Sequence, residues 1–244
     1  NQHLMRNDSY HVGEPFFFNP SLFHRTGCLR KMQYLFGFYA FKKELLDKLL
    51  VKKDNDMFSG LEKGGKLHRI FDNGNSMHER YSKYFKDMGL LVEEETTIKD
   101  LERRIKGRID LLIELDGKKY IVELKSMNGI QASKLKKPKP EHLLQLLFYM
   151  DILHIKQGYV LYENKNTQDI ISFYVDYEEN KAKLEHPHKI IDKVLENSKK
   201  GVLLDKKLDS CASCIFYDYC KEDVNVDQLL ENPKLWFGGW ENEN

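Results

Sequence analysis

The sequence predicts an α/β domain that is helical at its start and carries a small cysteine-rich segment at its end. Three observations predict this class. Apolar residues recur at helical spacing in the first part of the chain, strand-like runs alternating with helices follow, and three of the four cysteines gather after residue 208. Mixed strands and helices in this order favour an α/β domain with a C-terminal appendage.

Composition limits the class of protein further. Hydrophobic residues make up 41% of the 244 residues and charged residues 32%, so the chain can bury a sizeable core. Lys and Arg number 39 against 38 Asp and Glu, which excludes a protein surface that is basic overall. Any binding of nucleic acid would therefore need a local basic patch. With no membrane-length apolar run, no signal peptide and few cysteines, we expect a soluble cytoplasmic protein.

The individual elements follow in order along the chain. Helices are predicted at 28–50 and 67–88, where apolar residues recur at helical spacing, with a polar, glycine-containing stretch between them at 52–65. Strand-like runs follow at 92–98, 108–115 and 119–126. The basic stretch 133–140 is expected to be a loop because it contains two prolines. The body ends with a strongly apolar helix at 141–155, strands at 159–163 and 170–177, and a helix at 178–199.

The segment 107–125 predicts a β-hairpin with a defined register. Asp116-Gly117 between two strand-like runs is a strong signal for a two-residue loop. Such a loop pairs Leu115 with Lys118, Glu114 with Lys119 and Leu111 with Val122. The next pair in the same register is Asp110 and Glu123, whose β-carbons would lie about 4.5–5.5 Å apart.

This pair of carboxylates is locally unfavourable and predicts a metal site. Like charges opposite one another destabilise a sheet, and two carboxylates among apolar neighbours should raise one another's pKa values. A divalent cation removes both problems, and hard oxygen ligands suit Mg²⁺ or Mn²⁺. Lys125 lies on the same face as Glu123, where it could orient a water or offset charge on a phosphate. The alternative is an exposed hairpin edge with solvated charges.

Other side chains could complete or serve this site. His78, expected near the start of a helix, could give a mixed N/O metal site, although a lone histidine is more often structural and His68 is a local competitor. Gln145 and Tyr149 lie four positions apart and therefore on one face of a helix. They could be ordinary polar residues at the edge of the core, or they could contact a nucleic-acid strand. The lysines before that helix form a solvated loop or a path for a phosphate backbone; they are Lys134, Lys136, Lys137 and Lys139.

The cysteines form a second constellation. Cys211 and Cys214 are spaced as a Cys-x-x-Cys pair, Cys220 follows, and Cys28 lies far upstream. Four thiolates can hold a [4Fe–4S] cluster or Zn²⁺. A cluster or ion held by these four cysteines would link the N-terminal part of the chain to the C-terminal part. The alternative is four unlinked buried thiols.

In combination, these motifs resemble the RecB-like branch of the PD-(D/E)xK nucleases. The motifs, in chain order, are Gly-x-x-x-His at 74–78, Gly-x-Ile-Asp at 107–110, Glu-x-Lys at 123–125 and Gln-x-x-x-Tyr at 145–149. The cysteines are similar to those of the iron–sulfur members, of which the CRISPR-associated family called Cas four, with its phage-encoded relatives, is the closest match. Ile109 replaces the namesake proline, as is usual in this branch, and Leu29 stands where a proline often follows the first cysteine.

The resemblance implies a fold, a cofactor and roles for individual residues. The fold would be restriction-endonuclease-like: a mixed central sheet flanked by helices, with an N-terminal helical segment at 1–65, the nuclease core at 66–205 and an iron–sulfur segment and tail at 206–244. His78, Asp110, Glu123 and the Leu124 carbonyl would bind Mg²⁺ or Mn²⁺. Lys125 would be catalytic together with Asp110 and Glu123, and Gln145 and Tyr149 would contact the substrate or shape the site. Cys28, Cys211, Cys214 and Cys220 would hold [4Fe–4S].

The expected activity is that of a metal-dependent exonuclease acting mainly on single-stranded DNA. CRISPR integration proteins or recombination proteins are the expected partners. A nucleic-acid-binding adaptor without catalysis and a zinc-stabilised nuclease remain as alternatives. The aromatic tail 235–240 lies outside the resemblance.

Overall fold

The computed structural model describes residues 17–21, 23, 28–41, 61–200, 202–205 and 220. The chain divides into two compact units. One comprises residues 19–25 and 55–189, and the other comprises residues 1–18, 26–54 and 190–244. None of the described helices has both the length and the apolar character needed to cross a membrane.

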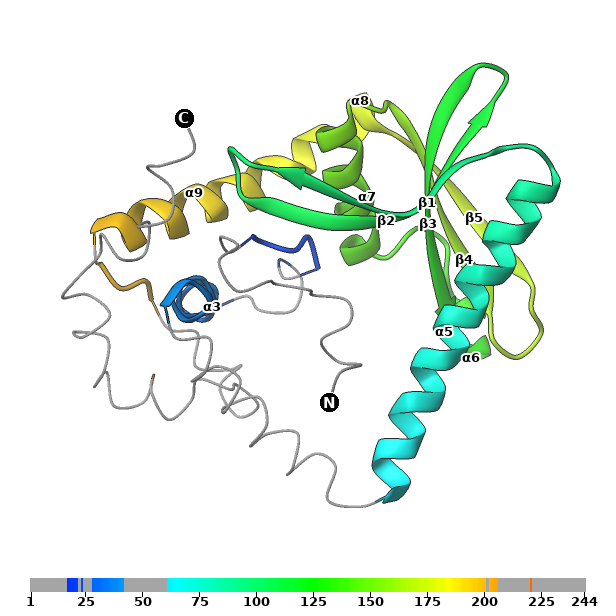
Figure 1. The fold of residues 1–244 in the computed structure, drawn as a ribbon, viewed down its shortest axis with the longest axis horizontal. Helices are drawn as coiled ribbons and strands as arrows, with labels where there is room; N and C mark the ends of the chain where they lie inside the picture. The colour runs from blue at the N-terminus through cyan, green and yellow to red at the C-terminus, as the bar shows by residue number, and fades with distance from the viewer. Residues whose placement is uncertain are drawn as a thin grey trace. The chain divides into compact units, whose positions relative to one another are not determined.

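A mixed five-stranded sheet forms the centre of the first unit (Figure 1). Its strands lie in chain order: β1 Leu91–Asp100, β2 Ile105–Leu115, β3 Lys118–Met127, β4 Gln157–Asn164 and β5 Ile170–Asp176. Neighbouring strands are antiparallel except β3 and β4, which are parallel. A parallel pair needs a crossover connection, and this one contains the helices α6 Gly129–Ser133 and α7 Pro140–Leu153. The predicted α/β class is therefore confirmed.

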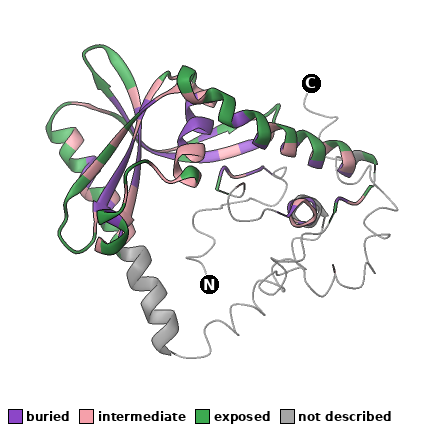
Figure 2. Ribbon diagram, turned by 180° about the vertical axis from the view of Figure 1, so that it is seen from behind, coloured by how far each residue is buried: buried purple, intermediate pink, exposed green. Residues whose placement is uncertain are grey.

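Helices cover both faces of the sheet. Helix α5, Leu61–Asp87, places Met77 and Tyr81 against apolar side chains of three strands, which are Leu111, Ile113, Val122, Leu124 and Leu161. On the opposite face, Leu146 of α7 contacts Gly158, which pairs with Ile121. Figure 2 shows that buried positions gather where the strands cross. Burial on both faces keeps the middle of the sheet away from water.

An ion pair also attaches α5 to the sheet. The Nη2 atom of Arg80 lies 2.7 Å from Oε1 and 2.5 Å from Oε2 of Glu163, whose side chain is largely buried at the end of β4. Arg80 is two residues after His78, so this contact helps to fix where His78 lies relative to the strands.

Some predicted boundaries differ from the structure. Helix α5 begins at Leu61, inside the polar stretch predicted at 52–65, so His78 lies well within a helix and not near its start. Helix α6 was not predicted; Asn128 caps it by accepting a hydrogen bond from the Gln131 N–H at 2.9 Å. The last predicted helix, 178–199, consists of three successive pieces: α8 Tyr177–Asn180, the 3₁₀ helix η1 Lys181–Leu184 and α9 Glu185–Lys200. Pro187 lies in the first turn of α9, where a missing N–H costs little.

In the second unit, helix α3, Leu29–Phe41, is joined to the segment 202–205. Gln33 is fully buried; its amide donates to the Val202 carbonyl at 2.7 Å and accepts from the Leu204 N–H at 2.9 Å. The Nε atom of Arg30 donates to the Leu204 carbonyl at 2.5 Å. Residues about 170 positions apart in the sequence are thus held together by three hydrogen bonds.

Candidate metal and catalytic site

The hairpin has the register that the sequence predicts. Leu115 pairs with Lys118, Glu114 with Lys119 and Leu111 with Val122. Asp116 and Gly117 both have positive φ, 53° and 71°, as a type I′ hairpin turn requires. Asp110 and Glu123 are the next position beyond the last pair, Leu111 and Val122.

At this next position the two strands separate. Strand β2 continues alongside β1 to Ile105, while β3 continues alongside β4 to Met127 (Figure 1). The backbone N–H of Leu124 donates to Oδ2 of Asp110 at 2.7 Å, so a carboxylate accepts the hydrogen bond that a strand carbonyl would otherwise accept. The side chains of Asp110 and Glu123 are both buried at this fork.

Burial and mutual repulsion disfavour ionisation of the two carboxylates. Burial raises the pKa of Asp110. Burial, followed by the charge of Asp110, raises the pKa of Glu123 to about 8. The ammonium group of Lys125 donates a hydrogen bond to Oε1 of Glu123. Burial alone would lower the pKa of Lys125, but the charges of Glu123 and Asp110 outweigh it and raise the pKa.

One oxygen of this cluster has no partner. Oε2 of Glu123 is buried and accepts no hydrogen bond from the part of the chain that the structure describes. A buried acceptor without a donor is costly, which is the situation that a bound cation relieves.

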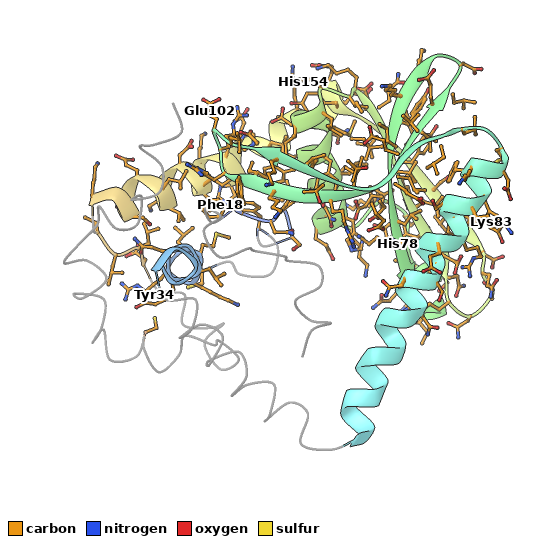
Figure 3. All side chains as sticks on the ribbon, in the orientation of Figure 1. Phe18, Tyr34, His78, Lys83, Glu102 and His154 are labelled. Carbon is orange, nitrogen blue, oxygen red and sulfur yellow. The ribbon has the colours of Figure 1, made fainter. Side chains whose placement is uncertain are left out.

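His78 reaches the same fork from α5. Its Nδ1 atom lies 2.7 Å from Oε1 of Glu95 and 3.7 Å from Oδ1 of Asp110. Burial alone would lower the pKa of His78, but the hydrogen bond with Glu95 and the charge of Asp110 outweigh it and raise the pKa. Figure 3 labels His78 on the helix beside the strands.

Glu95 was missed by sequence reasoning. It lies on β1 opposite Asp110, since Glu94 pairs with Leu111 and Thr96 with Ile109. The sequence does show three consecutive glutamates, 93–95, in a predicted strand. It does not show which of them faces Asp110, because that depends on the register between β1 and β2.

The donor set suits a hard divalent cation. One ligand atom from each of His78, Glu95 and Asp110 can be chosen so that all three lie within 4.8 Å of one another. Carboxylate oxygens with one imidazole nitrogen are donors that Mg²⁺ or Mn²⁺ accepts. The predicted ligand Glu123 is not one of these three residues; it follows Val122, the last β3 residue paired with β2, and its carboxylate is influenced by the charges of Asp110 and His78. Its place in the ligand set stays a prediction. The Leu124 N–H is bound to Asp110, and a ligand role for the Leu124 carbonyl stays a prediction.

The predicted Gln145–Tyr149 pair is joined to the Gly-x-Ile-Asp motif. Oη of Tyr149 accepts a hydrogen bond from Nε2 of Gln145 at 2.9 Å, and the ring is buried. A methyl group on Gly107 would overlap this ring: Cζ and Oη would be 3.1 Å away and Cε1 closer still. Of the two predicted roles for Tyr149, substrate contact or shaping of the site, this burial favours shaping.

We expect Gly107→Ala to destabilise the fold by about 1–3 kcal/mol, because the buried Tyr149 ring has to move. Gly74→Ala is the matched control, since Gly74 lies in α5 with nothing within 4 Å of the point that an added methyl group would occupy, and alanine favours a helix. Urea unfolding of both variants measures the difference. Equal stability of the two would contradict a tight Gly107–Tyr149 contact.

The basic loop lies next to the β3–β4 pair. Lys134, Lys136 and Lys137 are exposed between α6 and α7, as predicted for a loop. The backbone N–H of Lys139 donates to Oη of Tyr162 at 2.9 Å, and Tyr162 is the β4 partner of Lys125. Contact of these lysines with nucleic acid stays a prediction.

The cysteines are described only in part. Cys28 is buried immediately before α3, and Cys220 is half-buried. Cys211 and Cys214 lie outside the described residues, as does the tail 235–240. The four-cysteine cluster therefore stays a prediction.

The raised pKa of Glu123 predicts a pH-dependent stability without metal. The unfolded chain loses this proton near pH 4.5, whereas the folded protein retains it up to about pH 8, so this group destabilises the fold progressively as the pH rises between the two values. In chelator, Glu123→Gln should therefore raise Tm by several degrees at pH 8 and change it little at pH 5. Glu114→Gln, on an exposed position of β2, is the control. A Tm difference independent of pH would contradict the prediction.

Comparisons with known proteins identify the family of this chain. The family model described as the PD-(D/E)XK nuclease superfamily matches residues 42–221. A search of curated proteins finds no match. Among solved structures, "Crystal structure of SSO0001" is 19% identical, with a TM-score of 0.52 over 91% of this chain and 92% of that one. An alkaline exonuclease, LHK-Exo from Laribacter hongkongensis, is 17% identical, with a TM-score of 0.40 over 50% of this chain and 65% of that one. Because the family model covers well over half of its length, the chain belongs to the PD-(D/E)XK nuclease superfamily.

Proposed function

We propose that this protein is a metal-dependent deoxyribonuclease that degrades DNA, mainly single-stranded, as an exonuclease. The observation that carries the proposal is the fork between β2 and β3. There the buried pair Asp110 and Glu123 lies beside Lys125 and His78, and one oxygen of Glu123 has no donor among the described residues. A surface hairpin with solvated charges would not bury these groups.

Each residue of the site would have a separate role in phosphodiester hydrolysis. His78, Asp110 and Glu123 would hold Mg²⁺ or Mn²⁺, with the Leu124 carbonyl as a further ligand. When bound, such a cation supplies Lewis-acid chemistry that makes water a stronger acid and offsets negative charge on phosphate. Lys125, held by Glu123, orients the attacking water or stabilises the charge that grows on the phosphoryl oxygens. Gln145 and Tyr149 support the strand that carries Asp110.

The substrate strand would pass along the exposed lysines of the loop before α7. Lys134, Lys136 and Lys137 supply local positive charge on a chain whose net charge is only +1. The Lys139–Tyr162 hydrogen bond keeps this loop beside the strand pair that carries Lys125.

A structural [4Fe–4S] cluster held by Cys28, Cys211, Cys214 and Cys220 is the second part of the proposal. It is supported by the attachment of α3, which follows Cys28, to the segment 202–205, which precedes the other three cysteines. Anaerobically purified protein should be brown, with about four irons per chain. Colourless protein with stoichiometric zinc would replace the cluster by a zinc site.

This combination leads us to place the protein with the Cas four exonucleases and their phage-encoded relatives. The partners would then be CRISPR integration proteins or recombination proteins. Co-purification of a tagged chain with proteins encoded beside it tests this assignment.

Digestion of end-labelled DNA tests the activity. We expect degradation of single-stranded DNA from an end in Mg²⁺ or Mn²⁺, slower degradation of duplex, and none in chelator. A circular single strand is the control for end dependence, and labelled RNA is the control for sugar specificity. DNA binding without cleavage under every metal condition would favour the adaptor alternative.

A further inference from the structure

Glu95 has an unusual backbone for its position. It lies in strand β1 with φ 50°, in the left-handed region that residues other than glycine rarely adopt. Such a conformation is unfavourable and persists only where the surroundings enforce it. The side chain of Glu95 makes two contacts that could maintain this conformation.

Both carboxylate oxygens of Glu95 are held. Oε1 lies 2.7 Å from Nδ1 of His78, and Oε2 lies 2.7 Å from Nε of Arg108. Arg108 is on β2, two residues before Asp110, so one arginine fixes the orientation of Glu95 toward the fork. Glu95 on β1 thus lies opposite Asp110 on β2, and Glu123 on β3 follows Val122, the last residue that pairs with β2.

The spacing of the atoms fits ligands of one ion. Two adjacent ligands of an octahedral Mg²⁺ or Mn²⁺, each about 2.1 Å from the metal, lie about 3.0 Å apart. Nδ1 of His78 is 2.7 Å from Glu95 and 3.7 Å from Asp110, which brackets this value. An independent sign of a cation comes from Glu123, whose carboxylate is influenced by the charges of Asp110 and His78 and whose buried Oε2 has no donor among the described residues.

We infer that Glu95 is a ligand of the divalent cation, together with His78 and Asp110, and that Arg108 is the residue that positions it. This inference rests on the proposed metal-dependent function and extends its ligand set to β1. The contacts of its carboxylate with His78 and Arg108 are the described contacts that accompany the left-handed backbone of Glu95.

Calorimetric titration of the full chain with Mn²⁺, without DNA, tests the inference. Glu95→Gln keeps the size of the side chain and an oxygen that can accept from His78, but removes the charged ligand. We expect its Mn²⁺ affinity to fall by more than about 100-fold, since loss of a residue that only holds another ligand in place costs about 10–100-fold. Glu94→Gln is the matched control, since it removes the same charge from the neighbouring, exposed position.

The outcomes separate the inference from the proposed function. If wild-type protein binds Mn²⁺ and the affinity of Glu95→Gln is less than about 100-fold below that of Glu94→Gln, Glu95 is not a ligand and the proposed function stands. If wild-type protein binds no Mn²⁺, the proposed function itself fails. Arg108→Gln should weaken binding less than Glu95→Gln, and far-ultraviolet circular dichroism checks that every variant is folded.

Discussion

Lys125→Ala should reduce the rate of DNA cleavage by about 10²–10³-fold, since its ammonium group forms an ion pair with the buried Glu123 and no other described lysine does. The loss should appear in kcat and not in KM, because Lys125 is proposed to act on charge that develops during the reaction. Single-turnover cleavage of end-labelled DNA in excess Mn²⁺ measures it.

The controls exclude loss of fold or of general charge. Lys119→Ala removes a lysine from the exposed beginning of the same strand, where it faces Glu114, and should leave kcat nearly unchanged. Lys125→Ala should also stay folded, because its side chain is partly exposed and the strand is held by β4. Activity of purified Lys125→Ala within tenfold of wild type would remove Lys125 from the catalytic machinery.

Asp110→Asn should abolish measurable Mn²⁺ binding and lower cleavage by at least about 100-fold. The asparagine amide oxygen can still accept the Leu124 N–H, so the strands at the fork should keep their positions. In chelator the variant should be more stable than wild type at pH 8, because the repulsion with Glu123 is gone. Loss of activity thus comes with a gain in stability, which separates a functional effect from unfolding.

Asp116→Asn is the matched control for this substitution. Asp116 lies in the hairpin turn with φ 53°, a conformation that asparagine also adopts readily, so neither Mn²⁺ affinity nor stability should change much. Undiminished Mn²⁺ binding by Asp110→Asn would exclude Asp110 as a ligand and would overturn the assignment of the fork as the metal site.

Part of the site could be predicted because it is local. Asp116-Gly117 sets a register that carries forward to Asp110 and Glu123 without knowledge of the rest of the fold. Glu95 could not be placed in this way, since the register between β1 and β2 shifts between Leu91 and Glu93 and the link between the strands is not a two-residue turn. The contact between Gly107 and Tyr149 joins residues 42 positions apart in sequence, and it depends on how α7 packs.

The start of one helix could be predicted from neighbouring residues, whereas the start of another could not. Helix α7 begins at Pro140, as the prolines of the basic loop suggest. Helix α5 begins earlier than expected because its glycines do not end it, and the contacts of Met77 and Tyr81 with the sheet stabilise it. These contacts lie in the second half of the helix, at least 12 residues after the stretch 61–65.

The amide of Leu124 donates to a carboxylate of the site and not to a strand carbonyl. Its nitrogen-15 and proton chemical shifts should therefore respond directly to the charge on Asp110. A magnetic resonance spectrum of the labelled chain thus contains an intrinsic probe, in the residue before Lys125, that could follow cation loading without any added dye or substrate.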